Sequence, residues 1–419
     1  GNENLEAVEF LKHLNSIMKK RNPGVLMIAE ESTAWPKITG ALDEDGLGFD
    51  LKWNMGFMND YLSYIQTDPY FRSGRHNDLT FSIIYAYSEN FMLVFSHDEV
   101  VHGKATLLGK MPGERKDQFA NMRLTYAYHM THPGKKLLFM GQDIGEYDEF
   151  DEGRAVEWEL LQYEEHKGLN QLVADMNRLY VSKPALYAKD TSWDGFEWIN
   201  CITPDCCMLS YIRKAEKPED MLVIVANFAN KAQQFRVGVP YEGKYKEILN
   251  TDAKAYGGSD DVNREICHTT EIEWDGKPYA IDMVSAPLSI SIFSYTPYTK
   301  AEKEEIERER AEKLRLEKEA EERRLAAEEM ERAVRAAEEA KRLAESAVAE
   351  AEEQARQAAK RIEERKQEAV QLEKIAKEAE KNLELLAEKQ KKEHEERQQV
   401  KNNSVKKPAS KKKAEQKRR

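Results

Sequence analysis

The sequence has 419 residues, a formal net charge of −12, 41% hydrophobic residues and 33% charged residues. It has no run of about 18 apolar residues, which rules out an ordinary membrane-spanning helix. Its four cysteines are too few for a disulfide scaffold in a chain of this length, and no signal-peptide pattern opens the sequence. We therefore expect a protein of the reducing cytoplasm with no membrane partner.

The composition differs sharply between two parts of the chain. Residues 301–419 hold 33 Lys and Arg, 31 Asp and Glu, and no Gly, Trp, Tyr or Phe, whereas residues 1–300 carry a net charge of −14. A compact core needs turns and large apolar side chains, so this contrast predicts a globular part followed by an extended helical or disordered tail. The acidic globular part argues against nucleic acid as its main partner.

Strands and helices alternate in the first part of the chain. Apolar runs that stop at polar loops predict parallel strands at Val25–Ala29, Phe49–Asn54, Phe91–Phe95 and Lys135–Met140. Three- and four-residue apolar spacing predicts helices at Asn4–Lys20, Gly56–Gln66, Lys116–Met130 and Gly168–Val181. Such β/α units build a parallel sheet whose chemistry lies just after the strands.

The pattern changes near Ala185, where short strands follow one another without helices. We expect strands at Met208–Ile212, Leu222–Phe228, Gln234–Val239, Tyr245–Leu249 and Leu288–Tyr295. Turn residues separate them, which is typical of an all-β sandwich of about 110 residues.

The tail predicts one long charged helix over residues 299–400. Its Ala, Val and Ile residues from Ala333 to Ile362 recur at steps of four and three, which is an 11-residue repeat. A lone helix stabilised by charge pairs and a self-associating coiled coil both fit this pattern. Residues 401–419 are strongly basic, so we expect a disordered end, with contact to RNA or anionic lipid as the alternative.

Two carboxylates stand out by their position after predicted strands. Glu30 ends one apolar strand and Asp98 follows another, so a parallel barrel would point both into one mouth, as glycosyl-bond chemistry requires. His97 is placed to bind sugar hydroxyls, and Trp53 to stack on a sugar ring. The plainer interpretation is that each acid caps a helix and that Trp53 belongs to the core. No paired CxxC occurs, so we expect no metal site.

Several segments resemble the bacterial-type 1,4-alpha-glucan (glycogen) branching enzymes of the alpha-amylase superfamily. The resemblance covers residues 1–298, and the segments that carry it are Met27–Thr33, Phe95–Lys104, Pro133–Gly141, Trp193–Trp198 and Glu247–Asp252. It implies Glu30 as general acid/base, Asp98 as transition-state stabiliser and His97 at the donor sugar. It also implies a reaction on an α-1,4-glucan, glycogen or amylose, that cuts an α-1,4 link and forms an α-1,6 link, with no metal or organic cofactor.

The sequence departs from this family in one important respect. The family's nucleophile is an Asp in a segment like Gly-Leu-Arg-Val-Asp-Ala, and this sequence contains no such segment. Four predicted strands also make only half of an eight-stranded barrel, which usually takes about 250 residues. We therefore expect a fragment that is inactive and poorly stable alone, with open sheet edges.

The predicted fold class is α/β plus all-β, in four parts. Residues 1–184 form the C-terminal half of a (β/α)8 TIM barrel, 185–298 a β-sandwich, 299–400 the long helix and 401–419 the basic tail.

Two other functions stay open: an amylase-like α-glucan hydrolase, and a non-catalytic glucan-binding module on a helical scaffold. Product analysis distinguishes them, because only a branching enzyme makes new α-1,6 links.

Overall fold

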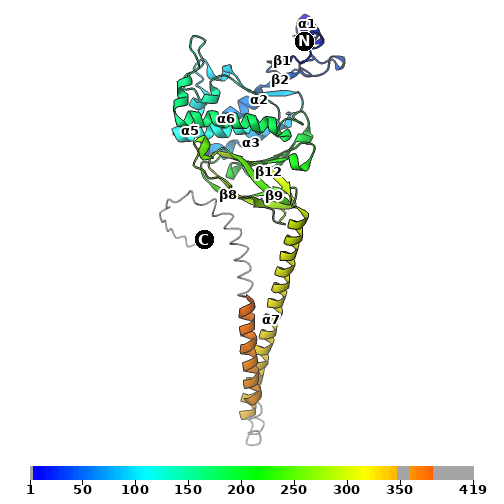
Figure 1. The fold of residues 1–419 in the computed structure, drawn as a ribbon, viewed down its shortest axis with the longest axis vertical. Helices are drawn as coiled ribbons and strands as arrows, with labels where there is room; N and C mark the ends of the chain where they lie inside the picture. Colours follow the sequence, from blue (N-terminus) through cyan, green and yellow to red (C-terminus); the bar gives the residue numbers. More distant parts are fainter. Residues whose placement is uncertain (1–2, 347–358, 381–419) are drawn as a thin grey trace. The chain divides into compact units, whose positions relative to one another are not determined.

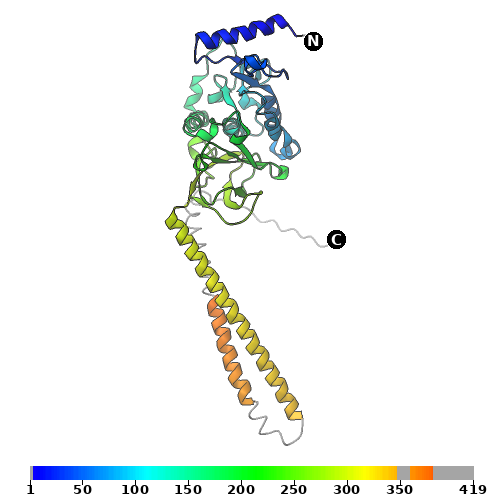
Figure 2. The same cartoon turned by 90° about the vertical axis from the view of Figure 1, so that its right-hand side faces the viewer.

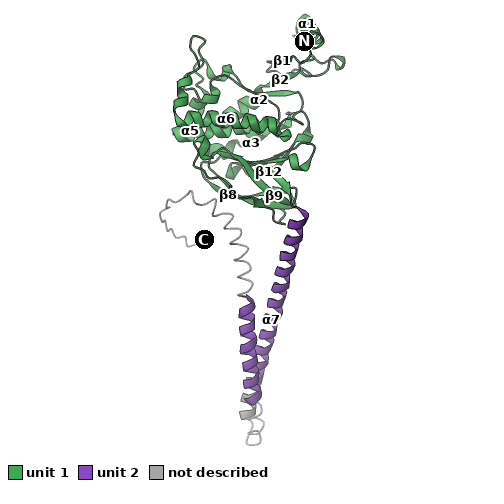
Figure 3. Cartoon of the chain, viewed as in Figure 1, with its two compact units in different colours: residues 1–297, 401–419 green, residues 298–400 purple. Residues whose placement is uncertain are grey.

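The chain folds into two compact units. The computed structural model describes residues 3–346 and 359–380. The first unit comprises residues 1–297 with 401–419, and the second comprises residues 298–400 (Figure 3). Within the described residues, no helix is both long enough and apolar enough to span a bilayer.

A four-stranded parallel sheet forms the first half of the first unit. Its strands pair in the order β1-β2-β3-β4, and all three pairings are parallel, as predicted. The bounds are Ile28–Ala29 for β1, Leu51–Asn54 for β2, Phe91–Phe95 for β3 and Lys135–Leu138 for β4. The helices around the sheet are α1 (Leu5–Arg21), α2 (Met55–Ile65), α3 (Asn77–Thr80), α4 (Leu107–Lys110), α5 (Arg115–Thr131) and α6 (Glu164–Ser182) (Figure 1).

The edge strand β1 differs from its prediction. The run Val25–Ala29 indicates a buried strand, but only Ile28 and Ala29 pair with β2, and Leu26 is 61% exposed. Within the described residues β1 has a neighbour on one side only, and Ile28 stays 38% exposed whereas Ala29 is buried. The same holds for α1, where Phe10 of the apolar stripe is 63% exposed.

Eight strands build the second half of the first unit. They are β5 (Phe196–Asn200), β6 (Met208–Arg213), β7 (Leu222–Asn227), β8 (Gln233–Val239), β9 (Gly243–Asn250), β10 (Cys267–His268), β11 (Tyr279–Ser285) and β12 (Ser289–Pro297). Six form an antiparallel sheet in the order β10-β9-β12-β7-β6-β5, and β11 pairs with β8 in a second sheet. The strands predicted here are present, whereas β5, β10 and β11 were not predicted.

Both faces of the six-stranded sheet are buried. Ile292 of β12 packs into the same core as Phe57 of α2, on the side of the parallel sheet. Its neighbour Phe293 points the other way and packs with Val237 and Ile281 of the β8–β11 pair. One continuous core therefore joins the α/β half to the all-β half.

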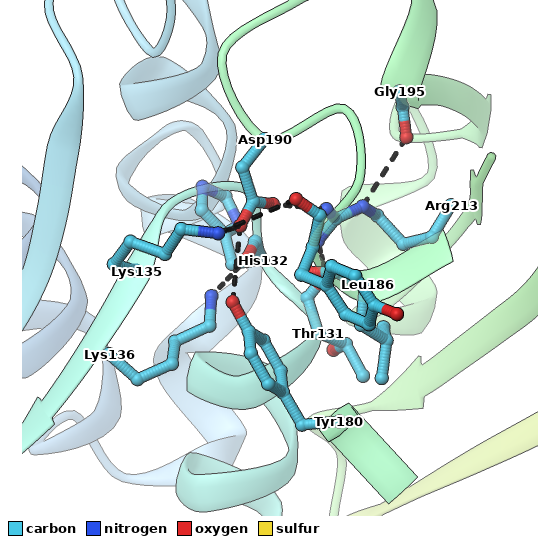
Figure 4. A network of polar contacts seen from close by, with 10 residues as sticks. Thr131, His132, Lys135, Lys136, Tyr180, Leu186, Asp190, Gly195 and Arg213 are labelled. Atoms are coloured by element: carbon cyan, nitrogen blue, oxygen red, sulfur yellow. Dashed lines mark hydrogen bonds and ion pairs between the residues drawn. The ribbon is translucent and has the colours of Figure 1, made fainter. Parts of the chain in front are cut away.

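A buried ionic network lies at this junction (Figure 4). The Arg213 guanidinium, on β6, is fully buried and donates to Asp190 Oδ1 at 2.6 Å and to the Thr131 carbonyl at 2.7 Å. Tyr180 and Lys135 each donate to Asp190 Oδ2 at 3.1 Å. Side chains from β4, α6 and β6 thus meet at one carboxylate.

Two buried histidines, His129 of α5 and His132 just after it, predict acid sensitivity of the first unit. Burial lowers the pKa of His129 to about 3 and that of His132 well below its ordinary value. Both stay neutral in the folded state, while unfolded histidine takes up a proton near pH 6.5. Since the unfolded state then binds more protons, we expect the free energy of unfolding to fall below pH 6.5, by up to about 2.7 kcal/mol per pH unit for two such groups.

Urea unfolding followed by tryptophan fluorescence between pH 7.5 and 5 measures this loss. His129→Gln should reduce the slope by about half, and His13→Gln, which changes an exposed histidine of α1, should leave it unchanged. An unfolding midpoint that does not change between pH 7 and 5 would contradict the prediction.

The second unit is helical in its described parts, and residues 347–358 and 381–400 of the predicted helix over 299–400 lie outside the described residues. α7 spans Lys300–Ser346, begins at a capping box in which Thr299 N donates to Glu302 Oε2, and a second helix occupies residues 359–380. Figures 1 and 2 show the two helices side by side. Val334 on the first and Ile362 on the second are buried, although most other side chains are exposed. Val334 and Ile362 are therefore covered within the same chain. The predicted basic tail, 401–419, lies outside the described residues.

Candidate active site

The predicted carboxylates lie at the same edge of the parallel sheet. Glu30 follows β1 directly, and Asp98 lies three residues beyond the end of β3. One strand, β2, lies between β1 and β3, so the backbones of β1 and β3 are about 10 Å apart, which is two strand spacings. Glu30 is exposed and the Asp98 side chain is 44% exposed, so both are accessible to a solute.

His97 and Asp98 form a pair on a short 3-10 helix, His97–Val100. His97 Nε2 lies 3.3 Å from Asp98 Oδ1, and the imidazole ring packs 5.9 Å from the ring of Phe139, which follows β4. The His97 side chain is 46% exposed. An exposed carboxylate beside an exposed imidazole presents one negative charge and one hydrogen-bonding ring to a substrate.

The turn that carries this pair is fixed by a capping box. Ser96 N and Ser96 Oγ both donate to Glu99 Oε2 at 2.7 Å, and Asp98 N donates to Ser96 Oγ at 3.2 Å. Glu99 is buried, so the box is shielded from water. Our sequence reasoning gave Glu99 no role, although the Ser-x-x-Glu spacing is the signal that finds it.

Trp53 lies in a separate aromatic cleft beside the loop after β1. The cleft measures about 500 Å³, and its lining includes Trp35, Trp53, Tyr85 and Glu31. Hydrogen bonds from Thr33 hold the pKa of Glu31 below its usual range. The Trp53 ring is also packed partly against the core, so it has both the contacts of a core residue and a face toward the cleft.

A second cleft, not predicted, follows β4. It measures about 360 Å³ and is lined mainly by acids, including Glu146, Glu149 and Asp151, with Arg154 among them. Burial raises the pKa of Glu146. Among residues 3–346 and 359–380, no three His, Cys, Asp or Glu side chains group in a way that would hold a metal ion.

These features define a class of protein. Residues 198–296 match the family model of the alpha amylase C-terminal all-beta domain. The solved structure titled AmyP in complex with maltose superposes with a TM-score of 0.50 at 11% identity, over 70% of this chain and 62% of that one. The chain therefore has an alpha-amylase-like fold with the C-terminal all-β domain of that family.

Curated relatives define the group within the family. The 1,4-alpha-glucan branching enzyme GlgB of Synechococcus elongatus is 49% identical over 290 residues, which are 69% of this chain and 38% of the relative. GlgB of Geobacillus stearothermophilus is 46% identical over 291 residues, covering 69% of this chain and 46% of the relative. The chain thus belongs to the GlgB-type proteins of the alpha-amylase family, and it spans less than half the length of these two relatives.

Proposed function

We propose that the first unit supplies part of the active site of a 1,4-alpha-glucan branching enzyme. The observation that carries this proposal is the placement of Glu30 and the His97–Asp98 pair at one edge of a parallel sheet, in a chain that is 49% identical to a GlgB enzyme over 290 residues. The substrate in this proposal is an α-1,4-glucan.

The proposed chemistry is a double displacement with retention at the anomeric carbon. Glu30 protonates O4 of the scissile link while the sugar C1 bonds to a carboxylate nucleophile. Glu30 then takes the proton of an incoming 6-hydroxyl as that oxygen bonds to C1 and releases the nucleophile. Asp98 stabilises the positive charge that develops on the sugar, and His97 binds a hydroxyl of the donor. Trp53 offers its ring to a glucan in the aromatic cleft.

In this proposal the four parallel strands are the second half of a (β/α)8 barrel. The chain then has four parts: the half-barrel at 1–184, the β-sandwich at 185–298, the long helix at 299–400 and the basic tail at 401–419. The exposed apolar residues of α1 and β1 support it, because a completed barrel would cover them. The nucleophile comes from outside these 419 residues, so the chain by itself does not turn over glucan.

Replacing the matched 290 residues of the S. elongatus relative with this whole chain tests the proposal. We expect the chimera to branch amylose, with a falling iodine absorbance and new α-1,6 links released by a debranching enzyme. The 419-residue chain alone is the control and should leave amylose intact. New reducing ends without α-1,6 links would favour the hydrolase alternative, and a folded chimera that binds amylose without changing it would favour the non-catalytic module.

A further inference from the structure

The loop after the His97–Asp98 pair is held between two opposite charges. Lys110, the last residue of α4, donates from Nζ to the carbonyls of Glu99 and Lys104, both at 2.5 Å, and to the carbonyl of Ala105. An ammonium group has three donors, so all three are used on this loop. No water or ligand is needed to satisfy the lysine.

Glu149 holds the same loop through its amides. Its Oε2 accepts from Gly103 N at 2.8 Å, and its Oε1 accepts from Ala105 N at 2.6 Å. Glu149 lies in the segment after β4, whereas Lys110 lies on α4 in the segment after β3. The two side chains therefore reach the loop from different segments of the chain. The cation binds loop carbonyls and the anion binds loop N–H groups.

The backbone of the loop requires such support. His102, Gly103 and Ala105 all have positive φ values, of 59°, 78° and 62°. Residues with a Cβ rarely adopt this conformation unless surrounding contacts impose it. Lys104, between them, donates from Nζ to the Asp98 carbonyl at 2.6 Å, which ties the loop back to the candidate acid.

We propose that Lys110 and Glu149 are positioning residues that fix the loop 99–105 and, through Lys104 and Glu99, the place of Asp98. This inference rests on the proposed function for its catalytic consequence, but the ordering of the loop is independent of it. Glu149 also lines the acidic cleft after β4, so the contacts of that cleft and the place of Asp98 are linked through one side chain.

Hydrogen exchange of the 419-residue chain tests the ordering. Glu149→Ala and Lys110→Met should each speed exchange of the Gly103 and Ala105 amides about tenfold, while peptides from β6 and β7 keep their rates. Glu149→Gln, which keeps one acceptor oxygen, should give an intermediate rate and serves if the alanine variant does not fold. Glu152→Gln and Lys116→Met change exposed residues nearby and are the matched controls. Unchanged exchange at Gly103 and Ala105, or equal acceleration throughout the unit, overturns the proposal.

Kinetics of the branching chimera test the consequence. We expect kcat to fall about 10- to 100-fold in Lys110→Met with KM nearly unchanged, and Lys110→Arg to restore part of it, because Asp98 acts in the transition state. A change in KM alone, or equal rates in Lys110→Met and Lys116→Met, contradicts positioning. A wild-type chimera without branching activity instead contradicts the proposed function, and the exchange result then decides the loop ordering by itself.

Discussion

Arg213→Met is expected to destabilise the first unit by about 3–5 kcal/mol, the usual cost of removing one partner of a buried ion pair. The guanidinium is fully buried, and the Asp190 side chain that it contacts is 3% exposed. Burial alone would raise the pKa of Asp190, but Arg213 and two nearby lysines hold it below its usual range. Methionine fills similar space and offers no charge, so a carboxylate would stay buried with weaker compensation.

The carbonyls around Arg213 add to the expected loss. The guanidinium also donates to Thr131 O, Leu186 O and Gly195 O, which lie on three separate segments. Buried carbonyls left without donors are costly. Removing the side chain therefore loosens the junction between the α/β half and the all-β half, which share one core.

Urea unfolding followed by tryptophan fluorescence measures this effect, because all six tryptophans precede residue 300 and report on the first unit alone. Arg236→Met is the matched control, since the Arg236–Asp282 pair is partly exposed and should contribute under about 1 kcal/mol. Replacing Asp190 by leucine together with Arg213→Met should recover part of the loss, because no unpaired charge remains. Equal unfolding midpoints for Arg213→Met and Arg236→Met would show that the buried ion pair stabilises the first unit no more than the partly exposed pair does.

Periodicity predicts the regular elements well where burial and local pattern agree. The run Phe91–Phe95 is buried by neighbouring strands on both sides, and the structure places β3 at those residues. The same reasoning is confirmed for only the last two residues of Val25–Ala29, because an apolar run indicates a tendency to be buried and not the presence of a neighbouring strand. β5 and β11 were missed since Asn, Asp and Glu interrupt their patterns; both lie near the edges of the sheets, where polar side chains reach solvent.

The polar supports of the candidate site were less predictable. Lys110 and Glu149 lie 39 residues apart and are connected only through loop 99–105, so no local spacing in the sequence predicts their role. Positive φ values at His102 and Ala105 have no sequence signal either, because only Gly103 of the three positive-φ positions in this loop is a glycine. In the second unit, the 11-residue Ala stripe predicts helix but does not specify whether a covering helix would come from another chain or from the same one.

Glu30→Gln is expected to lower kcat of the branching chimera about 10²- to 10⁴-fold, the range for removing a general acid/base. Glutamine keeps the size of the side chain, but its amide N–H is far too weak an acid to protonate O4. Asp98→Asn should cost about 10²- to 10³-fold, as for loss of one group that stabilises transition-state charge. Both side chains are exposed or half exposed, so neither change should alter the unfolding midpoint.

A glucosyl fluoride donor separates the two roles, because fluoride leaves without needing a proton. Glu30→Gln should therefore recover most of its rate of covalent-intermediate formation with α-maltosyl fluoride, whereas Asp98→Asn should remain slow, since charge still develops on the sugar. Glu44→Gln is the matched control: its side chain is exposed and lines neither cleft, and we expect less than about a threefold change. If Glu30→Gln and Glu44→Gln behave alike with amylose, the general acid/base must be another residue. If fluoride rescues Asp98→Asn instead, the assignments of the two carboxylates must be exchanged.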